Sequence, residues 1–181
     1  MKQHTEPEPE LISVRIATDA RDYLSRYFEI DGGCDLMIVE RNLPNDMFGR
    51  FNPEESFPLY IIDIDEKKVM RKFPSLLEMV VGEEIGQLLF YLSHKEMHHG
   101  VLPEHLRGLI FIQKVIGCYS GMVYANRDPS RPIFLKPNAE KEKAYSLANK
   151  LYEKYKDTKL EELNRVKSLS EFNNLVQRLG V

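Results

Sequence analysis

FPSLLEMVVGEEIGQLLFYLSHKEMHHG, residues 73–100, is the stretch that decides the fold. Its pattern predicts one long helix, because apolar residues recur at intervals of three and four: Leu77, Val81, Ile85, Leu88 and Leu92. Ser75 and Glu78 have the spacing of an N-terminal capping box, and Gly100 is a typical helix end. The apolar face must be buried, so we expect the rest of the chain to pack around this helix.

A polar stripe runs along a second face of the same predicted helix. Its members repeat at helical intervals: Glu84, Gln87, Tyr91, His94 and His98. This stripe is the most informative functional feature of the chain, although it names no activity by itself.

The composition is that of an ordinary globular domain. The chain has 181 residues, of which 43% are apolar and 29% charged, enough to bury a core without disulfides or metals. The net charge of −3 gives no footprint for nucleic acid, and no apolar run reaches the roughly 20 residues of a membrane span. Cys34 and Cys118 are far apart, so we expect reduced thiols in a cytoplasmic protein, and the acidic residues 1–10 are expected to be a disordered tail.

A small sheet is predicted ahead of the long helix. Three short apolar segments and an edge strand supply it: 12–16, 36–39, 59–64 and 48–51. Thr18 is expected to cap a helix over 19–28, with one continuous helix over 10–28 as the alternative. The charged residues 65–68 are predicted to form a turn before the long helix.

Helices dominate the second half of the chain. Pro103 is expected to open a second long helix that is apolar around much of its girth and reaches about Tyr124. Glycine costs about 1 kcal/mol against alanine inside a helix. Three glycines in this helix therefore indicate the close approach of another helix: Gly108, Gly117 and Gly121. Further helix caps are expected at Asn138, Thr158 and Ser170, with Gly180 ending the last helix.

The predicted fold class is therefore α+β and mostly helical, with a small sheet packed on a long central helix. Residues 11–157 are expected to form the main domain, and residues 158–181 a C-terminal helical extension.

Residues 80–90, VVGEEIGQLLF, place E-E-I-G-Q in the frame of the zinc-binding motif H-E-x-G-H. Together with the strands expected before the helix, this segment resembles the ImmA/IrrE family of zincin metallopeptidase-like domains over about residues 19–150. The resemblance implies a zincin-like fold, with Glu84 at the position of the general base and Gly86 at that of the frequent glycine. Glu83 and Gln87 stand at the two ligand positions, and Glu142 matches a third ligand on a later helix.

The substitutions at the ligand positions have a chemical consequence. Zinc sites are built from imidazole, thiolate and carboxylate groups, and the neutral amide of Gln87 is a weak ligand. The resemblance therefore implies a catalytically inactive relative without a bound cofactor, acting as a binding or regulatory module with a protein partner as one option. We expect Glu83, Glu84 and Gln87 to face a cleft between the sheet and the later helices.

Two alternatives remain open. His94 and His98 are four residues apart and, with Glu84, predict a metal-dependent hydrolase that uses zinc or another divalent transition metal. Histidines in the last turn of a helix are also favoured simply by the helix dipole, and a Glu-Glu pair is often only a solvated face. The other alternative is therefore a structural helical adaptor.

Overall fold

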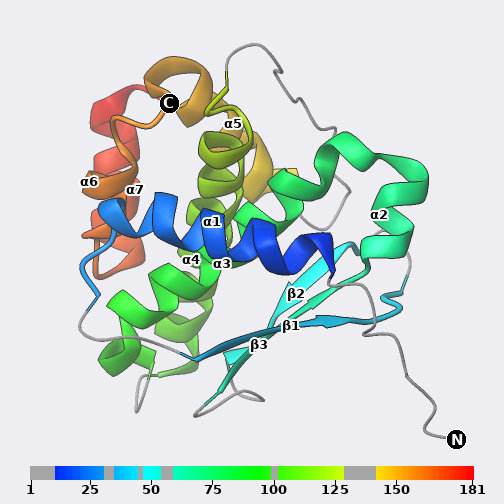
Figure 1. Ribbon diagram of the computed structural model, residues 1–181. Helices are drawn as coiled ribbons and strands as arrows, with labels where there is room; N and C mark the ends of the chain where they lie inside the picture. The colour runs from blue at the N-terminus through cyan, green and yellow to red at the C-terminus, as the bar shows by residue number, and fades with distance from the viewer. Residues whose placement is uncertain (1–10, 31–34, 45–46, 54–58, 99–101, 129–141) are drawn as a thin grey trace, which may run out of the picture.

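The computed structural model describes residues 11–30, 35–44, 47–53, 59–98, 102–128 and 142–181. Over these residues the fold is α+β, with helices packed around and above one small mixed sheet (Figure 1). The expected tail over 1–10, the cap at Asn138 and Cys34 lie outside the described residues. Cys118 is buried and forms no disulfide with any residue the structure describes.

The elements follow one another in the order α1 (Ile12–Leu24), η1 (Ser25–Tyr27), β1 (Leu36–Glu40), β2 (Gly49–Phe51), β3 (Tyr60–Ile64), α2 (Glu66–Lys72), η3 (Pro74–Leu76), α3 (Leu77–Ser93), η4 (Lys95–His98), α4 (Pro103–Ala125), α5 (Glu142–Tyr155), α6 (Leu160–Asn164) and α7 (Leu169–Leu179), where η marks a 3-10 helix.

The sheet confirms three of the predicted strands. Its order is β1-β3-β2, with β1 parallel and β2 antiparallel to the central β3. Leu36 pairs with Tyr60, and Gly49 pairs with Ile64 at the other edge. The short strand β2 thus lies at an edge, where it can contact the helices.

The strand predicted over 12–16 is wrong, and the alternative of a continuous helix is close to the observed α1. The buried positions of α1 follow a helical period: Ser13, Ala17, Ala20 and Leu24. A carboxylate from α2 satisfies the start of the helix, because Glu66 accepts hydrogen bonds from the N–H groups of Ile12 (3.2 Å) and Ser13 (2.8 Å). Thr18 is not a cap, since it lies inside α1.

The turn predicted over 65–68 is also wrong, because these residues begin α2. The Asp65 side chain accepts from the N–H of Lys68 and caps the helix, while Val69 is buried beneath it. Asp65 and Glu66 are buried and accept hydrogen bonds from backbone N–H groups, whereas Lys67 is exposed. A run of charged residues alone therefore could not distinguish a solvated turn from this helix.

The long helix is shorter than predicted at both ends. It begins as α3 at Leu77 after a 3-10 turn, and no side-chain capping bond forms, so the capping box of Ser75 and Glu78 is wrong. The α-helix ends at Ser93, where the backbone of His94 leaves helical geometry (φ −123°) before a 3-10 turn.

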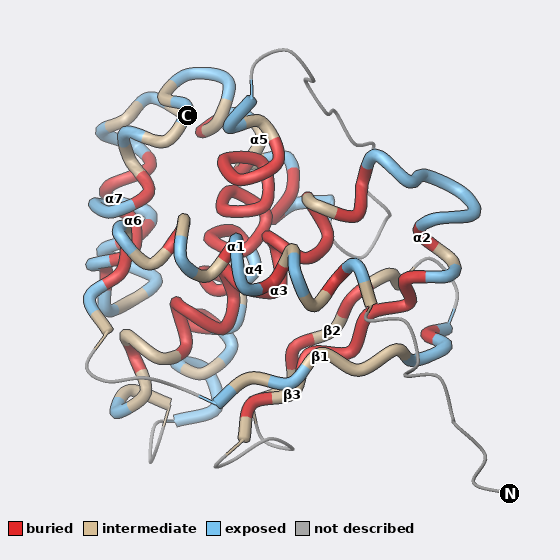
Figure 2. Tube along the Cα trace, viewed as in Figure 1, coloured by how far each residue is buried: buried red, intermediate tan, exposed pale blue. Residues whose placement is uncertain are grey.

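Two helices, α3 and α4, form the centre of the molecule and are buried over most of their length (Figure 2). Glycines let them meet closely, as predicted for Gly117 and Gly121. A Cβ atom on Gly121 would lie 2.7 Å from the carbonyl oxygen of Met79, and one on Gly86 would lie 2.4 Å from Cβ of Ser120. Gly86 is therefore a packing position.

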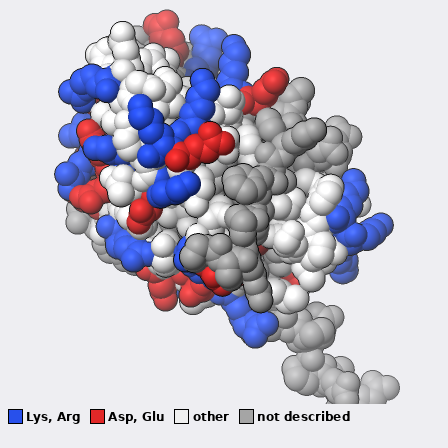
Figure 3. Space-filling view, turned by 90° about the horizontal axis from the view of Figure 1, so that it is seen from above, with Lys and Arg blue, Asp and Glu red and all other residues white. Residues whose placement is uncertain are grey.

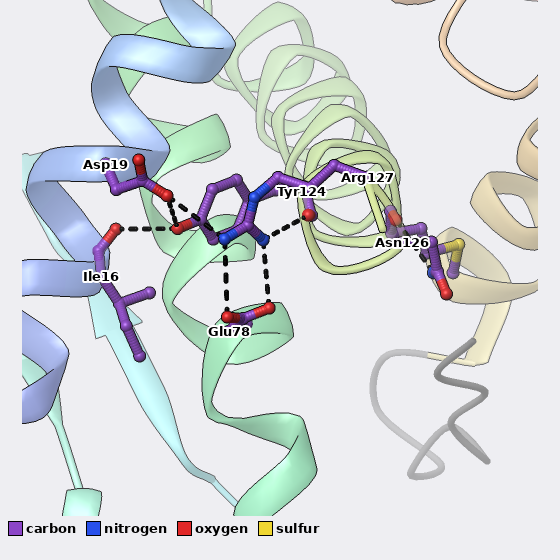
Figure 4. Close-up of polar contacts among 7 residues, drawn as sticks. Ile16, Asp19, Glu78, Tyr124, Asn126 and Arg127 are labelled. Carbon is purple, nitrogen blue, oxygen red and sulfur yellow. Dashed lines mark hydrogen bonds and ion pairs between the residues drawn. The ribbon is translucent and has the colours of Figure 1, made fainter. Parts of the chain in front are cut away.

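A network of hydrogen bonds and ion pairs connects α1, α3 and the end of α4 (Figure 4). The guanidinium of Arg127 lies 3.9 Å from the ring centre of Tyr124 and forms ion pairs with Glu78 (3.0 Å) and Asp19 (3.2 Å). The Tyr124 hydroxyl donates to Asp19 at 2.6 Å, and burial raises the pKa of Tyr124, so this hydroxyl stays a donor.

The C-terminal helices share the core of the rest of the protein through side chains such as Leu160, Leu163 and Phe172. Two of the predicted caps are wrong. Lys159 precedes α6 in place of Thr158, and Ser168 caps α7 in place of Ser170. Gly180 ends α7 in the left-handed conformation, as predicted (φ 66°).

Candidate functional site

Glu84 lies beneath the edge strand β2. Its side chain is only 2% exposed, and Oε2 accepts hydrogen bonds from the backbone N–H of Phe51 (2.9 Å) and from Nε2 of Gln87 (3.2 Å). The approach requires a glycine on the strand, because a Cβ atom at Gly49 would lie 2.8 Å from Cγ of Glu84. Glu84 therefore fastens the sheet to the central helix.

Glu83 and Gln87, at the ligand positions of the zincin frame, are packed against α4. Both are buried, and a Cβ atom at Gly117 would lie 2.4 Å from Cγ of Gln87 and 2.9 Å from the carbonyl oxygen of Glu83. Gln87 also lines a cavity, as expected, whereas Glu83 and Glu84 are not among the described residues that line it. The ligand frame thus consists of a carboxylate and an amide held by close helix packing.

His94 points away from Glu84 and toward the C-terminal segment. Its Nε2 lies 3.0 Å from the carbonyl oxygen of Val166, and its Nδ1 lies 3.0 Å from both the Phe90 carbonyl and the Ser93 hydroxyl. Burial lowers the pKa of His94, against the raising effect of the two carbonyl groups. Through these contacts His94 connects α3 to the chain before α7.

His98 lies on the other side, in η4, with its ring 4.8 Å from that of Tyr91. The two histidines do not share one α-helical face, because α3 ends at Ser93. Among the residues that the structure describes, no three His, Cys, Asp or Glu side chains form a group that could hold a metal. The expected sets with Glu84 or with Glu142, which begins α5, are therefore not assembled.

A cavity of about 630 Å³ lies where the polar stripe meets β2 and α4. The described residues that line it come from the end of β2, from α3 and η4, and from the first half of α4: Phe51, Asn52, Pro53, Gln87, Tyr91, Lys95, His98, Leu106, Ile110, Gln113 and Lys114. Three members of the predicted stripe, Gln87, Tyr91 and His98, therefore share one cavity.

Sequence reasoning missed the two polar residues that α4 contributes to this cavity. Gln113 and Lys114 interrupt the apolar run of α4 between Leu109 and Val115. Gln113 is buried and Lys114 is exposed. An amide at a buried position of a core helix was the available signal, because such a side chain needs a polar partner or a cavity.

Comparisons of the chain with protein-family models, with curated proteins and with solved structures found no significant match. The resemblance to zincins therefore rests on residues 80–90 and their surroundings alone.

The surface charges and the most apolar helix bear on possible partners. Seen from above, basic and acidic side chains are interspersed over the side that carries the C-terminal helices (Figure 3). Within the described part of the chain, α4 is the one helix long and apolar enough to cross a membrane, but 83% of its most apolar window is buried inside the protein, which is common for a core helix.

Proposed function

We propose that this protein is a catalytically inactive, zincin-like binding module that uses the cavity beside its degenerate motif. The observation that carries the proposal is the position of Glu84, the residue in the frame of the general base. Its carboxylate accepts a hydrogen bond from the N–H of Phe51 beneath β2, and the residue is only 2% exposed. A general base would have to reach a water molecule, whereas this carboxylate connects the strand to the helix.

The residues at the ligand positions also support this proposal. Gln87 uses an amide hydrogen to bind Glu84, and a neutral amide does not replace an imidazole in a zinc site. Glu83 would be a single carboxylate ligand without a nitrogen or sulfur partner on the same face. This donor set does not fit zinc, and we derive no catalytic step through a metal.

The cavity supports binding as the remaining role. It is open to ligands beside Gln87 and Tyr91, and its size is typical of sites for small molecules, which range over about 300–1,000 Å³. The alternative hydrolase requires His94 and His98 in one site, and His94 is instead bonded to the carbonyl of Val166.

The test measures metal content and hydrolysis together. The purified protein is analysed for zinc, iron and manganese, and casein hydrolysis is followed with and without added zinc, for the wild type and for Glu84→Gln. We expect far less than one metal ion per chain and no hydrolysis above that of the variant. One metal ion per chain that is lost in His94→Ala, or hydrolysis that is lost in Glu84→Gln, would contradict the proposal.

A further inference from the structure

We infer that the cavity between β2, α3 and α4 binds a small organic anion with a flat, apolar body, of the class of aromatic carboxylates. The inference rests on the proposed function, because it assigns a ligand class to the same site.

The walls of the cavity favour an apolar ligand body. Phe51, Leu106 and Ile110 line it together with the ring of Tyr91, which lies 5.9 Å from the ring of Phe51. Ile110 is 41% exposed although it is a large apolar residue of a central helix, so a ligand in the cavity would cover apolar surface that now faces solvent. Aromatic walls favour a ring, which can stack or meet them edge to face.

Buried amides supply the polar contacts. Gln113 is only 7% exposed, lines the cavity and hydrogen-bonds to no residue that the structure describes. Its amide group can therefore offer both a donor and an acceptor to a ligand. Gln87 donates one amide hydrogen to Glu84 and also lines the cavity.

The charge around the cavity favours an anion. Two lysines, Lys95 and Lys114, line it, and none of the described lining residues is an Asp or a Glu. Lys114 is exposed at the rim, where its ammonium group can reach a carboxylate that projects from the bound ring.

The experiment uses two probes of nearly the same shape, one an anion and the other neutral. 2-Naphthoate and 2-naphthamide are titrated separately into the ¹⁵N-labelled full chain at low ionic strength, where charge effects are least screened. Backbone and side-chain amide signals are followed by NMR for the wild type, Lys114→Gln and Gln113→Leu. Lys150→Gln, an exposed lysine on α5, is the matched control.

We expect saturable binding of 2-naphthoate, several-fold tighter than that of 2-naphthamide, with shifts of the Gln113 side-chain NH₂ signals. Lys114→Gln should weaken naphthoate binding about two- to fivefold and leave naphthamide binding unchanged, as for one exposed charge pair. Gln113→Leu should weaken both probes about fivefold. Lys150→Gln should change neither.

Absence of saturable naphthoate binding, equal affinity for the two probes, or equal behaviour of Lys114→Gln and Lys150→Gln would overturn the inference. If Gln113→Leu does not fold, the exposed Lys114→Gln variant still decides. These results leave the proposed function standing, whereas metal-dependent hydrolysis would remove the proposed function whatever the probes do.

Discussion

At the scale of single residues, Gly121 shows why two helices can meet at the centre of this protein. A Cβ atom there would lie 2.7 Å from the carbonyl oxygen of Met79 and 3.1 Å from the backbone nitrogen of Glu83. Both neighbours are main-chain atoms of α3, so they cannot turn aside as a flexible side chain could. The usual gain of alanine over glycine in a helix is therefore reversed.

We predict that Gly121→Ala lowers the free energy of unfolding by about 2 kcal/mol or more, as overpacking of a core does. Gly108→Ala on the same helix is the control, because its nearest contact is the side chain of Leu169 at 3.1 Å. That variant should stay within about 1 kcal/mol of the wild type. Urea unfolding measures both, and equal effects of the two substitutions would show that α3 and α4 are not in close contact.

His94 makes stability depend on pH. Burial lowers the pKa of His94 below its ordinary value of 6.5, so the unfolded chain binds a proton first as the pH falls. The stabilisation by neutral His94 is therefore present above about pH 6.5 and is lost as the pH falls through the folded-state pKa. Acid stability is thus linked to the contact between α3 and Val166.

The melting temperature should consequently fall less between pH 7.5 and pH 5.5 in His94→Gln than in the wild type. His105→Gln, an exposed histidine at the start of α4, should keep the wild-type dependence. Identical slopes in all three proteins would show that His94 is not held neutral in the folded state.

At the scale of elements, only one of the two serines near the start of α7 caps the helix. The Ser168 hydroxyl accepts from the N–H of Glu171, and the Glu171 carboxylate accepts in turn from the N–H of Lys167 (2.8 Å). Ser170 lies within the helix and is exposed. A helix that loses its cap leaves N–H groups unsatisfied.

We predict that Ser168→Ala lowers the free energy of unfolding by about 1 kcal/mol. Ser170→Ala should change it by less than about 0.5 kcal/mol, as most exposed substitutions do. Thermal unfolding of the two variants checks this difference, and a larger loss for Ser170→Ala would place the cap where sequence reasoning put it.

Local patterns were sufficient for β1, β3, α4 and the end of α7. They failed for α1, where Ile12, Val14 and Ile16 alternate like a strand. The residues buried in α1 are mostly small, and Ser13 is buried because it hydrogen-bonds to Glu66, 53 positions away. Such a partner leaves no trace in a local pattern.

The candidate site was predictable to a similar extent. Gln87 and Tyr91 lie on α3 and His98 lies in the following 3-10 turn, and all three line the cavity. His94 has the same spacing in the sequence but does not line the cavity. The helix α3 ends at Ser93, and Nε2 of His94 lies 3.0 Å from the carbonyl oxygen of Val166. Gln113 was missed because its helix is apolar around much of its girth and was assigned to the core as a whole.

At the scale of the whole molecule, the sheet is attached to the helical core through Glu84. The edge strand β2 meets α3 through Gly49 and through the bond from the N–H of Phe51 to Glu84. The same arrangement buries the carboxylate that a zincin would use as its base. A structural role and a catalytic role for Glu84 therefore predict opposite effects of its removal on stability.

The most direct test is the free energy of unfolding of Glu84→Ala, measured in urea beside Glu96→Ala, an exposed acid in η4. Removal of the acceptor leaves the Phe51 N–H buried without its partner and opens a small cavity, so we predict a loss of about 2–4 kcal/mol. Glu96→Ala should lie within about 0.5 kcal/mol of the wild type. Substitution of a catalytic residue commonly leaves stability unchanged or raises it. Unchanged or increased stability of Glu84→Ala would contradict the account.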